Sequence, residues 1–166
     1  MDIFEFAMEK EKFSEEYYRD LAQRANHAGL RNILTMLADE EAKHYRVVER
    51  MRTETPEQVT DVPVLARARE VFEKMRVSPK KFDFRTSEAE LYRKACQIEE
   101  QSKKFYLEKA REVREPGQKR VFELLAREED KHLYLMENLY SFVSRPETFL
   151  ENAEMYHFDD YVDEPL

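Results

Sequence analysis

The sequence predicts an all-α protein in which two similar helical hairpins pack into a four-helix bundle. The 166 residues include only 2 glycines and 6 prolines, and 39% of them are charged. This composition is typical of long helices and not of sheets joined by many turns. Apolar residues also recur at alternating steps of three and four, the spacing of one helical face. Finally, the second half of the chain repeats the first.

The first hairpin is expected over residues 2–52, with one helix over about 2–25 and a second over about 30–52. Gly29 between them is predicted to be a stop and turn. The predicted inward face of the first helix is Phe4, Ala7, Met8, Glu11, Ser14, Tyr18, Leu21, Ala22 and Ala25. That of the second is Leu30, Leu34, Leu37, Glu41, His44, Val48 and Met51. A short loop between two amphipathic helices predicts antiparallel packing.

The segment 53–86 is predicted to be a long crossover that contains a short helix over about 64–75. A connection of this length is unusual in a compact domain unless it has to cross the structure. We therefore expect it to run along the bundle, so that the second hairpin begins at the opposite end.

The second hairpin is expected over residues 87–144, with Thr86 or Ser87 as its N-cap. Pro116 and Gly117 should break it, and the last helix should then run over about 118–144. The third helix presents Leu91, Ala95, Ile98, Glu99, Ser102, Tyr106 and Ala110; the fourth presents Phe122, Leu125, Glu129, His132, Met136, Leu139 and Val143. The remainder, 145–166, is an acidic and aromatic tail, which we expect to dock on this bundle or on a partner subunit.

An internal repeat relates the two hairpins. Residues 7–53 align with residues 95–141 without a gap, and 13 of the 47 positions are identical. The identities include Ala7/Ala95, Glu11/Glu99, Ser14/Ser102, Tyr18/Tyr106, Gly29/Gly117, Leu37/Leu125, Ala38/Ala126, Glu41/Glu129 and His44/His132. The chain is therefore a duplicated hairpin, and residues on its inner face should occur twice around a pseudo-twofold axis.

The repeat contains the candidate metal ligands. Six residues interrupt otherwise apolar helical faces: Glu11, Glu41, His44, Glu99, Glu129 and His132. Burying ionised carboxylates is costly unless they are paired, protonated or bound to a metal. Two divalent cations would balance the four glutamates, and residues three apart on a helix, such as Glu41 and His44, share a face. Oxygen ligands with two nitrogens favour iron or manganese over a metal that prefers thiolates.

Two duplicated pairs are expected beside these ligands. Ser14 and Ser102 lie one turn beyond the first-helix glutamates of their hairpins. Tyr18 and Tyr106 lie about 10 Å along the helix axis from Glu11 and Glu99, respectively. We expect each phenol to donate a hydrogen bond to the glutamate of its own helix. The neighbours Glu40 and Glu128 are expected on the solvated face of their helices.

Composition excludes several classes of function. The net charge of −8, with no basic block, argues against nucleic-acid binding. The single cysteine, Cys96, excludes an intrachain disulfide and is expected in the core. No apolar run reaches the length of a membrane span and no signal peptide is recognised, so a cytoplasmic location is expected. His27 is expected at the surface or as a cap, and His157 is not expected to bind metal.

These motifs resemble the rubrerythrin-like branch of the ferritin-like superfamily. The resemblance covers about residues 1–144 and rests on Ala-x-x-x-Glu followed by an aromatic–Tyr pair (7–18 and 95–106), and on Leu-Ala-x-Glu-Glu-x-x-His (37–44 and 125–132). It implies a ferritin-like bundle with a carboxylate-bridged di-iron centre, bridged by Glu41 and Glu129 or by Glu11 and Glu99. Rubrerythrins proper add a four-cysteine rubredoxin domain and an extra glutamate ligand, whereas this chain has one cysteine and has serines one turn past Glu11 and Glu99.

The function expected first is a di-iron oxidoreductase that acts on peroxide, dioxygen or ferrous iron, with a separate electron-donor protein. Three alternatives stay open: manganese-catalase-like chemistry on the same ligands, iron binding or storage without turnover, and a metal-free interaction scaffold. A homo-oligomer, most simply a dimer, is expected, with no nucleic-acid or membrane partner.

Overall fold

The computed structural model describes residues 2–54, 64–77, 82 and 84–151, and all of its regular elements are helices. These are α1 (Ile3–Arg24), α2 (Ala28–Arg50), α3 (Val64–Arg76), α4 (Thr86–Glu112), α5 (Pro116–Ser144) and α6 (Pro146–Glu151). The four long helices match the four predicted ones, and α3 matches the predicted short helix. The short helix α6 was not predicted, since its six residues were assigned to the tail.

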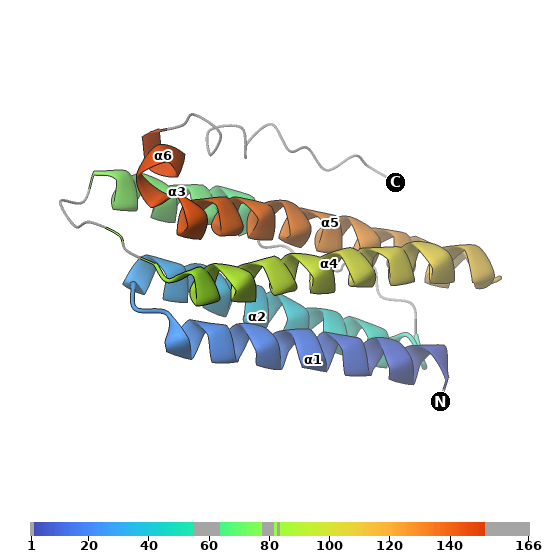
Figure 1. The fold of residues 1–166 in the computed structure, drawn as a ribbon. Helices are drawn as coiled ribbons and strands as arrows, with labels where there is room; N and C mark the ends of the chain where they lie inside the picture. The colour runs from blue at the N-terminus through green and yellow to red at the C-terminus, as the bar shows by residue number, and fades with distance from the viewer. Residues whose placement is uncertain (1, 55–63, 78–81, 83, 152–166) are drawn as a thin grey trace.

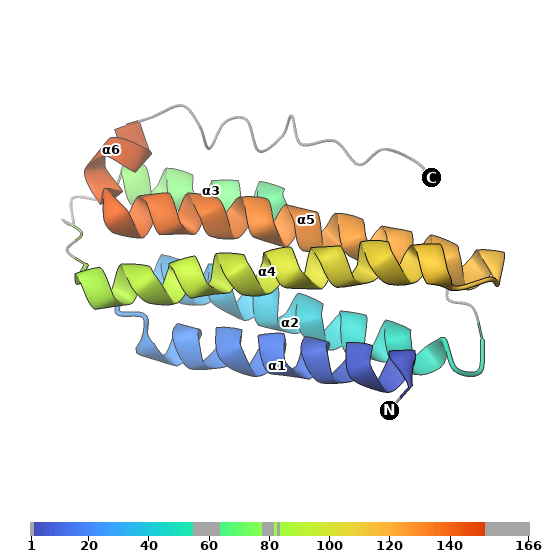
Figure 2. The ribbon, with the colours of Figure 1, turned by 45° about the vertical axis from the view of Figure 1, so that its right-hand side comes forward.

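The long helices form a ferritin-like bundle of two antiparallel hairpins, α1–α2 and α4–α5 (Figure 1). The helix α2 ends at one end of the bundle and α4 begins at the other, as the predicted crossover requires, and α1 and α4 lie side by side in both views (Figures 1 and 2). The helix α3 packs outside α2 and α5, and α6 covers α3 and the end of α5.

The helix boundaries follow from local capping. Asp2 forms a capping box with Glu5 at the start of α1, with N–H to carboxylate distances of 2.8 and 3.3 Å. At the start of α2, His27 Nδ1 accepts a hydrogen bond from the Gly29 N–H at 3.0 Å, so His27 is a cap, as predicted. In the equivalent place of the repeat, Glu115 accepts bonds from the first turn of α5.

Three boundary predictions were wrong. Gly29 does not stop a helix but lies in the first turn of α2, where a Cβ would approach Met75 Cε of α3 to 2.1 Å. Gly117 likewise lies inside α5, which begins at Pro116, because proline at the first position of a helix fits the helical φ and removes an N–H that needs no partner. The N-cap of α4 is Arg85, not Thr86 or Ser87.

The core consists of two apolar clusters on either side of a polar layer. The larger cluster lies at the end that α3 and α6 cover and includes Leu34, Phe72 and Phe142. The smaller cluster includes Val48 and Phe122. Phe149 of α6 packs on Phe72 and Phe142, so this part of the tail docks on its own bundle. The tail beyond residue 151 lies outside the described residues.

Candidate metal centre

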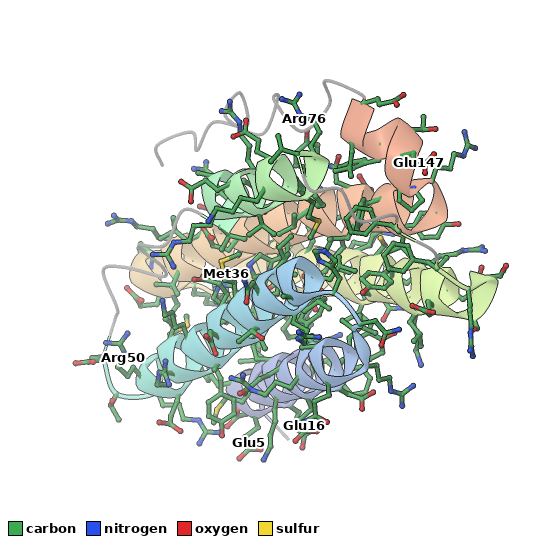
Figure 3. The ribbon with its side chains drawn as sticks, turned by 90° about the vertical axis from the view of Figure 1, so that its left-hand side faces the viewer. Glu5, Glu16, Met36, Arg50, Arg76 and Glu147 are labelled. Atoms are coloured by element: carbon green, nitrogen blue, oxygen red, sulfur yellow. The ribbon has the colours of Figure 1, made fainter. Side chains whose placement is uncertain are left out.

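The polar layer between the two clusters contains the six predicted ligands. Each is at most 2% exposed: Glu11 on α1, Glu41 and His44 on α2, Glu99 on α4, and Glu129 and His132 on α5. Other glutamates of α1 behave in the usual way: Glu5 and Glu16 point away from the bundle into solvent (Figure 3). The burial of Glu11 on the same helix is therefore a specific feature of this layer.

The histidines link the two hairpins. His44 Nδ1 lies 2.9 Å from Glu129 Oε1, and His132 Nδ1 lies 3.0 Å from Glu41 Oε1. The two imidazole rings stack with their centroids 5.4 Å apart and their planes 12° from parallel. Each histidine thus directs Nδ1 toward the carboxylates and contacts the opposite hairpin.

The layer divides into two overlapping groups. One atom each from Glu11, Glu41, His44 and Glu129 lie within 4.8 Å of one another, and one atom each from Glu41, Glu99, Glu129 and His132 do the same. Glu41 and Glu129 belong to both groups. Of the two bridging pairs that the resemblance implies, this geometry favours Glu41 and Glu129, because Glu11 and Glu99 each belong to one group only.

The glutamates that belong to both groups (Glu41 and Glu129, the shared glutamates) and those that belong to one group (Glu11 and Glu99, the unshared glutamates) differ in how strongly they hold a proton. Burial raises the pKa of Glu41 well above its usual range, and the charges of Glu99 and Glu11 add to this effect. Burial and the charge of Glu41 likewise raise the pKa of Glu129. Burial alone would also raise the pKa of Glu11 and Glu99, but hydrogen bonds and histidine charge outweigh it. The pKa of Glu11 is lowered and that of Glu99 falls to about 2.

The histidines are affected in the opposite sense by the same charges. Burial alone would lower the pKa of His44, but the charge and hydrogen bond of Glu11 outweigh it and raise that pKa well above its usual value. The pKa of His132 is raised as well, because the hydrogen bond and charge of Glu99 outweigh the effect of burial. The raised pKa values favour protons on Glu41, Glu129 and the two imidazoles, and such protons would offset the negative charge of the layer.

The layer fits a pair of divalent cations. Oε2 of Glu11, Glu41, Glu99 and Glu129 is buried without a hydrogen-bond partner among the described residues. A buried carboxylate oxygen without a partner is unfavourable unless a proton or a cation binds it. Two divalent cations would balance the four carboxylates, and the set of oxygens with two nitrogens suits iron or manganese.

The two tyrosines contact the layer differently from the prediction. Tyr18 donates a hydrogen bond to Glu99 Oε1, and Tyr106 donates one to Glu11 Oε1 at 2.5 Å. The expectation that each phenol binds the glutamate of its own helix is therefore wrong. The reason is packing: α1 and α4 run antiparallel, so that the tyrosine of one helix lies level with the glutamate of the other. Burial raises the pKa of both phenols well above the usual value, so both keep their protons.

The burial of a further duplicated pair, Glu40 and Glu128, was not predicted. Glu40 and Glu128 are 1% and 8% exposed, and neither lies on a solvated face. Lys43 Nζ lies 3.6 Å from Glu40 Oε1, and Lys131 Nζ lies 3.0 Å from Glu128 Oε1. The internal repeat could have indicated this burial, because Glu40 aligns with the identical Glu128 and Lys43 aligns with the identical Lys131.

Glu40 also lies beside the imidazoles. One atom each of Glu40, His44 and His132 lie within 4.8 Å of one another. Glu40 Oε2, His44 Nε2 and His132 Nε2 are all buried without a hydrogen-bond partner among the described residues. A histidine that binds a metal through one nitrogen usually donates the proton of its other nitrogen to an acceptor such as a carboxylate.

The remaining candidates lie away from this layer. Cys96 is partly buried against the larger cluster, as predicted, and burial raises its pKa to about 12. His157 falls outside the described residues. Within the described part of the chain, no helix has the length and apolar character needed to cross a membrane.

Four buried glutamates and two buried histidines at the centre of a four-helix bundle define a candidate di-metal carboxylate site. The chain matches the family model described as rubrerythrin over residues 2–140 and again over residues 90–158. It therefore belongs to the rubrerythrin family, as the motifs predicted.

Other comparisons add the fold but no function. A solved structure described as a hypothetical protein from Pyrococcus furiosus matches with a TM-score of 0.66 and 22% sequence identity. The match covers 88% of this chain and 90% of that one. Similarity at this identity shows a common fold. No curated protein matches the chain.

Proposed function

We propose that this protein is a di-metal carboxylate oxidoreductase that acts on peroxide, dioxygen or ferrous iron. Iron is the first candidate metal and manganese is the second. One observation carries the proposal: two four-residue groups of buried ligands overlap in Glu41 and Glu129. A pair of adjacent ions with two common carboxylates is the arrangement that this overlap supports.

The ligands divide between the two ions by hairpin. Glu11 and His44 would hold one ion, Glu99 and His132 would hold the other, and Glu41 and Glu129 would contact both. Two ferrous ions held in this way would supply the two electrons that, with two protons, convert hydrogen peroxide into two molecules of water. Apolar clusters lie on both sides of the layer, and such low-dielectric surroundings strengthen its electrostatic interactions.

The tyrosines would position the unshared ligands. The phenol of Tyr18 orients Glu99 and that of Tyr106 orients Glu11, and each keeps a proton at its hydroxyl oxygen beside the centre. Such donors fix ligand geometry from behind the metal-binding atoms. Since the chain has one cysteine and cannot hold a four-cysteine iron site, electrons would come from a separate donor protein.

Anaerobic loading with ferrous iron tests the proposal. We expect two ions per chain and, on mixing with peroxide or air, a change in visible absorption in stopped flow that requires Glu41. The variant Glu16→Ala, on the exposed side of α1, is the matched control and should behave like the wild type. Failure to bind two ions per chain would overturn the proposal, and metal analysis of protein from its native host decides between iron and manganese.

A further inference from the structure

A hollow of about 320 Å³ opens on the surface between α1 and α4. Among the described residues, its lining comes from these two helices and includes Phe6, Glu9, Lys10, Phe13, Ser14 and Ser102. The hollow therefore lies on the side of the polar layer that faces away from α2 and α5. These two helices supply four of the six candidate ligands.

The hydrogen bonds of the tyrosines fix where the hollow meets the layer. Tyr18 bonds Glu99 and Tyr106 bonds Glu11, so each of these pairs spans from α1 to α4 at one level of the bundle. The two levels mark the two halves of the centre, because Glu11 and Glu99 belong to different ligand groups.

Ser14 and Ser102 lie between these two levels. On each helix the serine follows the glutamate by three residues and precedes the tyrosine by four. In antiparallel helices this order places the serines opposite each other, at the pseudo-twofold axis that passes between the two ligand groups. Both serines are buried, at 2% and 5% exposure, and both line the hollow. The bottom of the hollow thus lies over the middle of the candidate centre.

The chemistry of the rim favours a small neutral molecule. Phe6 and Phe13 are 45% and 55% exposed, and Lys10 Nζ lies 5.5 Å from the ring centroid of Phe6. Glu9 is the one acidic residue among the described residues of the lining, and Lys10 carries the opposite charge. A path for ferrous ions would need a surplus of acidic groups, which this lining does not have.

We propose that this hollow is the path by which a small neutral oxidant, hydrogen peroxide or dioxygen, reaches the centre, with Ser14 and Ser102 as its narrowest point. The inference rests on the proposed function. Two small side chains leave space at the axis, whereas a larger pair would fill it.

The first arm of the test needs no metal and stands apart from the proposed function. In a Cys96→Ala background, Ser102→Cys should react with a small neutral thiol reagent such as iodoacetamide in the folded protein. A Cys96→Ala/Leu37→Cys protein, with its thiol in the core, is the matched control and should react far more slowly. No faster reaction at position 102 would overturn the hollow as a path, whether or not the protein binds metal.

The second arm uses iron-loaded protein and a graded series. Ser14→Ala should keep the oxidation rate within about two-fold, whereas Ser14→Val and then Ser14→Leu should slow it by about ten-fold or more, because the larger side chains fill the space. The Ser102 series should behave in the same way, and Ser87→Leu, on the exposed start of α4, should not change the rate. The iron-loaded protein is mixed with peroxide in one experiment and with dioxygen in another, and the comparison shows which oxidant depends on the path.

Two further readouts keep the second arm interpretable. Metal stoichiometry and circular dichroism should be unchanged in the Val variants, which cover the case in which a Leu variant fails to fold. The association rate of nitric oxide with the ferrous protein, a measure of access without turnover, should fall in the same order. Leu variants that take up oxidant and nitric oxide at the wild-type rate would overturn the proposal. Slower uptake of ferrous iron with unchanged oxidation of preloaded protein would overturn it too.

Discussion

The two hairpins are nearly equivalent at the candidate metal centre and differ outside it. Each supplies one glutamate from its first helix and a Glu-x-x-His pair from its second, and each tyrosine bonds the glutamate of the other hairpin. Outside the centre the symmetry is lost, because α3 and α6 cover only one end of the bundle and enlarge one apolar cluster. The two copies therefore agree in the six candidate ligands and the two tyrosines, and they differ in the elements that pack around them.

The largest expected effect comes from removing a shared carboxylate. Glu41→Ala and Glu129→Ala should each abolish binding of both ions, because each residue belongs to both ligand groups. We expect apparent affinity to fall by more than about 100-fold, since even residues behind the ligands contribute 10- to 100-fold. Metal content after loading and dialysis measures this, with circular dichroism as the check on folding. One ion retained in either variant would contradict the shared role.

Removing an unshared carboxylate should affect one half of the centre. Glu11→Ala should weaken the ion held with His44, and Glu99→Ala the ion held with His132, because each glutamate belongs to a single group. Titration with ferrous or manganous ion, followed by calorimetry, should give one tight site per chain in each variant. Unequal results for the two variants would show that the hairpins are not equivalent even at the centre.

The stability of the metal-free protein should depend on pH. Folding raises the pKa of Glu41, Glu129 and both histidines, so their contribution is complete below the ordinary values of 4.5 and 6.5 and is lost as pH rises through the folded values. Glu11 and Glu99 act in the opposite direction, but their contribution is lost only as pH falls through their folded values, about 2 for Glu99. The melting temperature with a chelator present should therefore fall between about pH 5 and about pH 8.

Two comparisons check this pH dependence. Glu41→Gln should flatten it, because the amide does not titrate. Added metal should raise the melting temperature more at pH 8 than at pH 5, because a bound cation replaces protons. A melting temperature that rises with pH in the metal-free protein would contradict the assignment.

The tyrosines should have smaller and equal effects. Tyr18→Phe and Tyr106→Phe each remove one hydrogen bond to an unshared glutamate and keep the ring in the core. We expect each to lower metal affinity by about ten-fold or somewhat more. Tyr17→Phe, whose hydroxyl bonds the Leu91 carbonyl away from the centre, is the control. A loss of metal affinity in the control as large as in the other two would make the effect a general one on packing.

Residue spacing predicted the centre because its features repeat in register. The four helices and the six candidate ligands follow from helical periodicity and from the identity of Glu11 with Glu99, Glu41 with Glu129 and His44 with His132. The partners of the tyrosines could not be predicted in the same way, because spacing along one helix does not fix the axial register of another. Gly29 was misread since its role, leaving space for Met75, depends on where α3 packs.

The smallest expected effect tests where the symmetry ends. Glu40 and Glu128 are equivalent in the repeat. Within the described part of the chain, however, Glu40 and not Glu128 belongs to a group with both histidines, and Glu40 Oε2 is buried without a hydrogen-bond partner. Lys131 bonds Glu128 at 3.0 Å and, at 14% side-chain exposure, can reach water. Removing Glu40 should disturb the orientation of the imidazoles, whereas removing Glu128 should not.

Metal titration of the matched pair measures this difference. Glu40→Ala should lower metal affinity by about ten-fold or less, the low end of the range for a residue that orients a ligand. Glu128→Ala should leave metal affinity unchanged. The conservative change Glu40→Gln keeps an acceptor oxygen near the imidazoles and should restore part of the loss, which a purely structural role would not predict. Equal losses in the two alanine variants would contradict this difference and would extend the symmetry of the hairpins beyond the six candidate ligands.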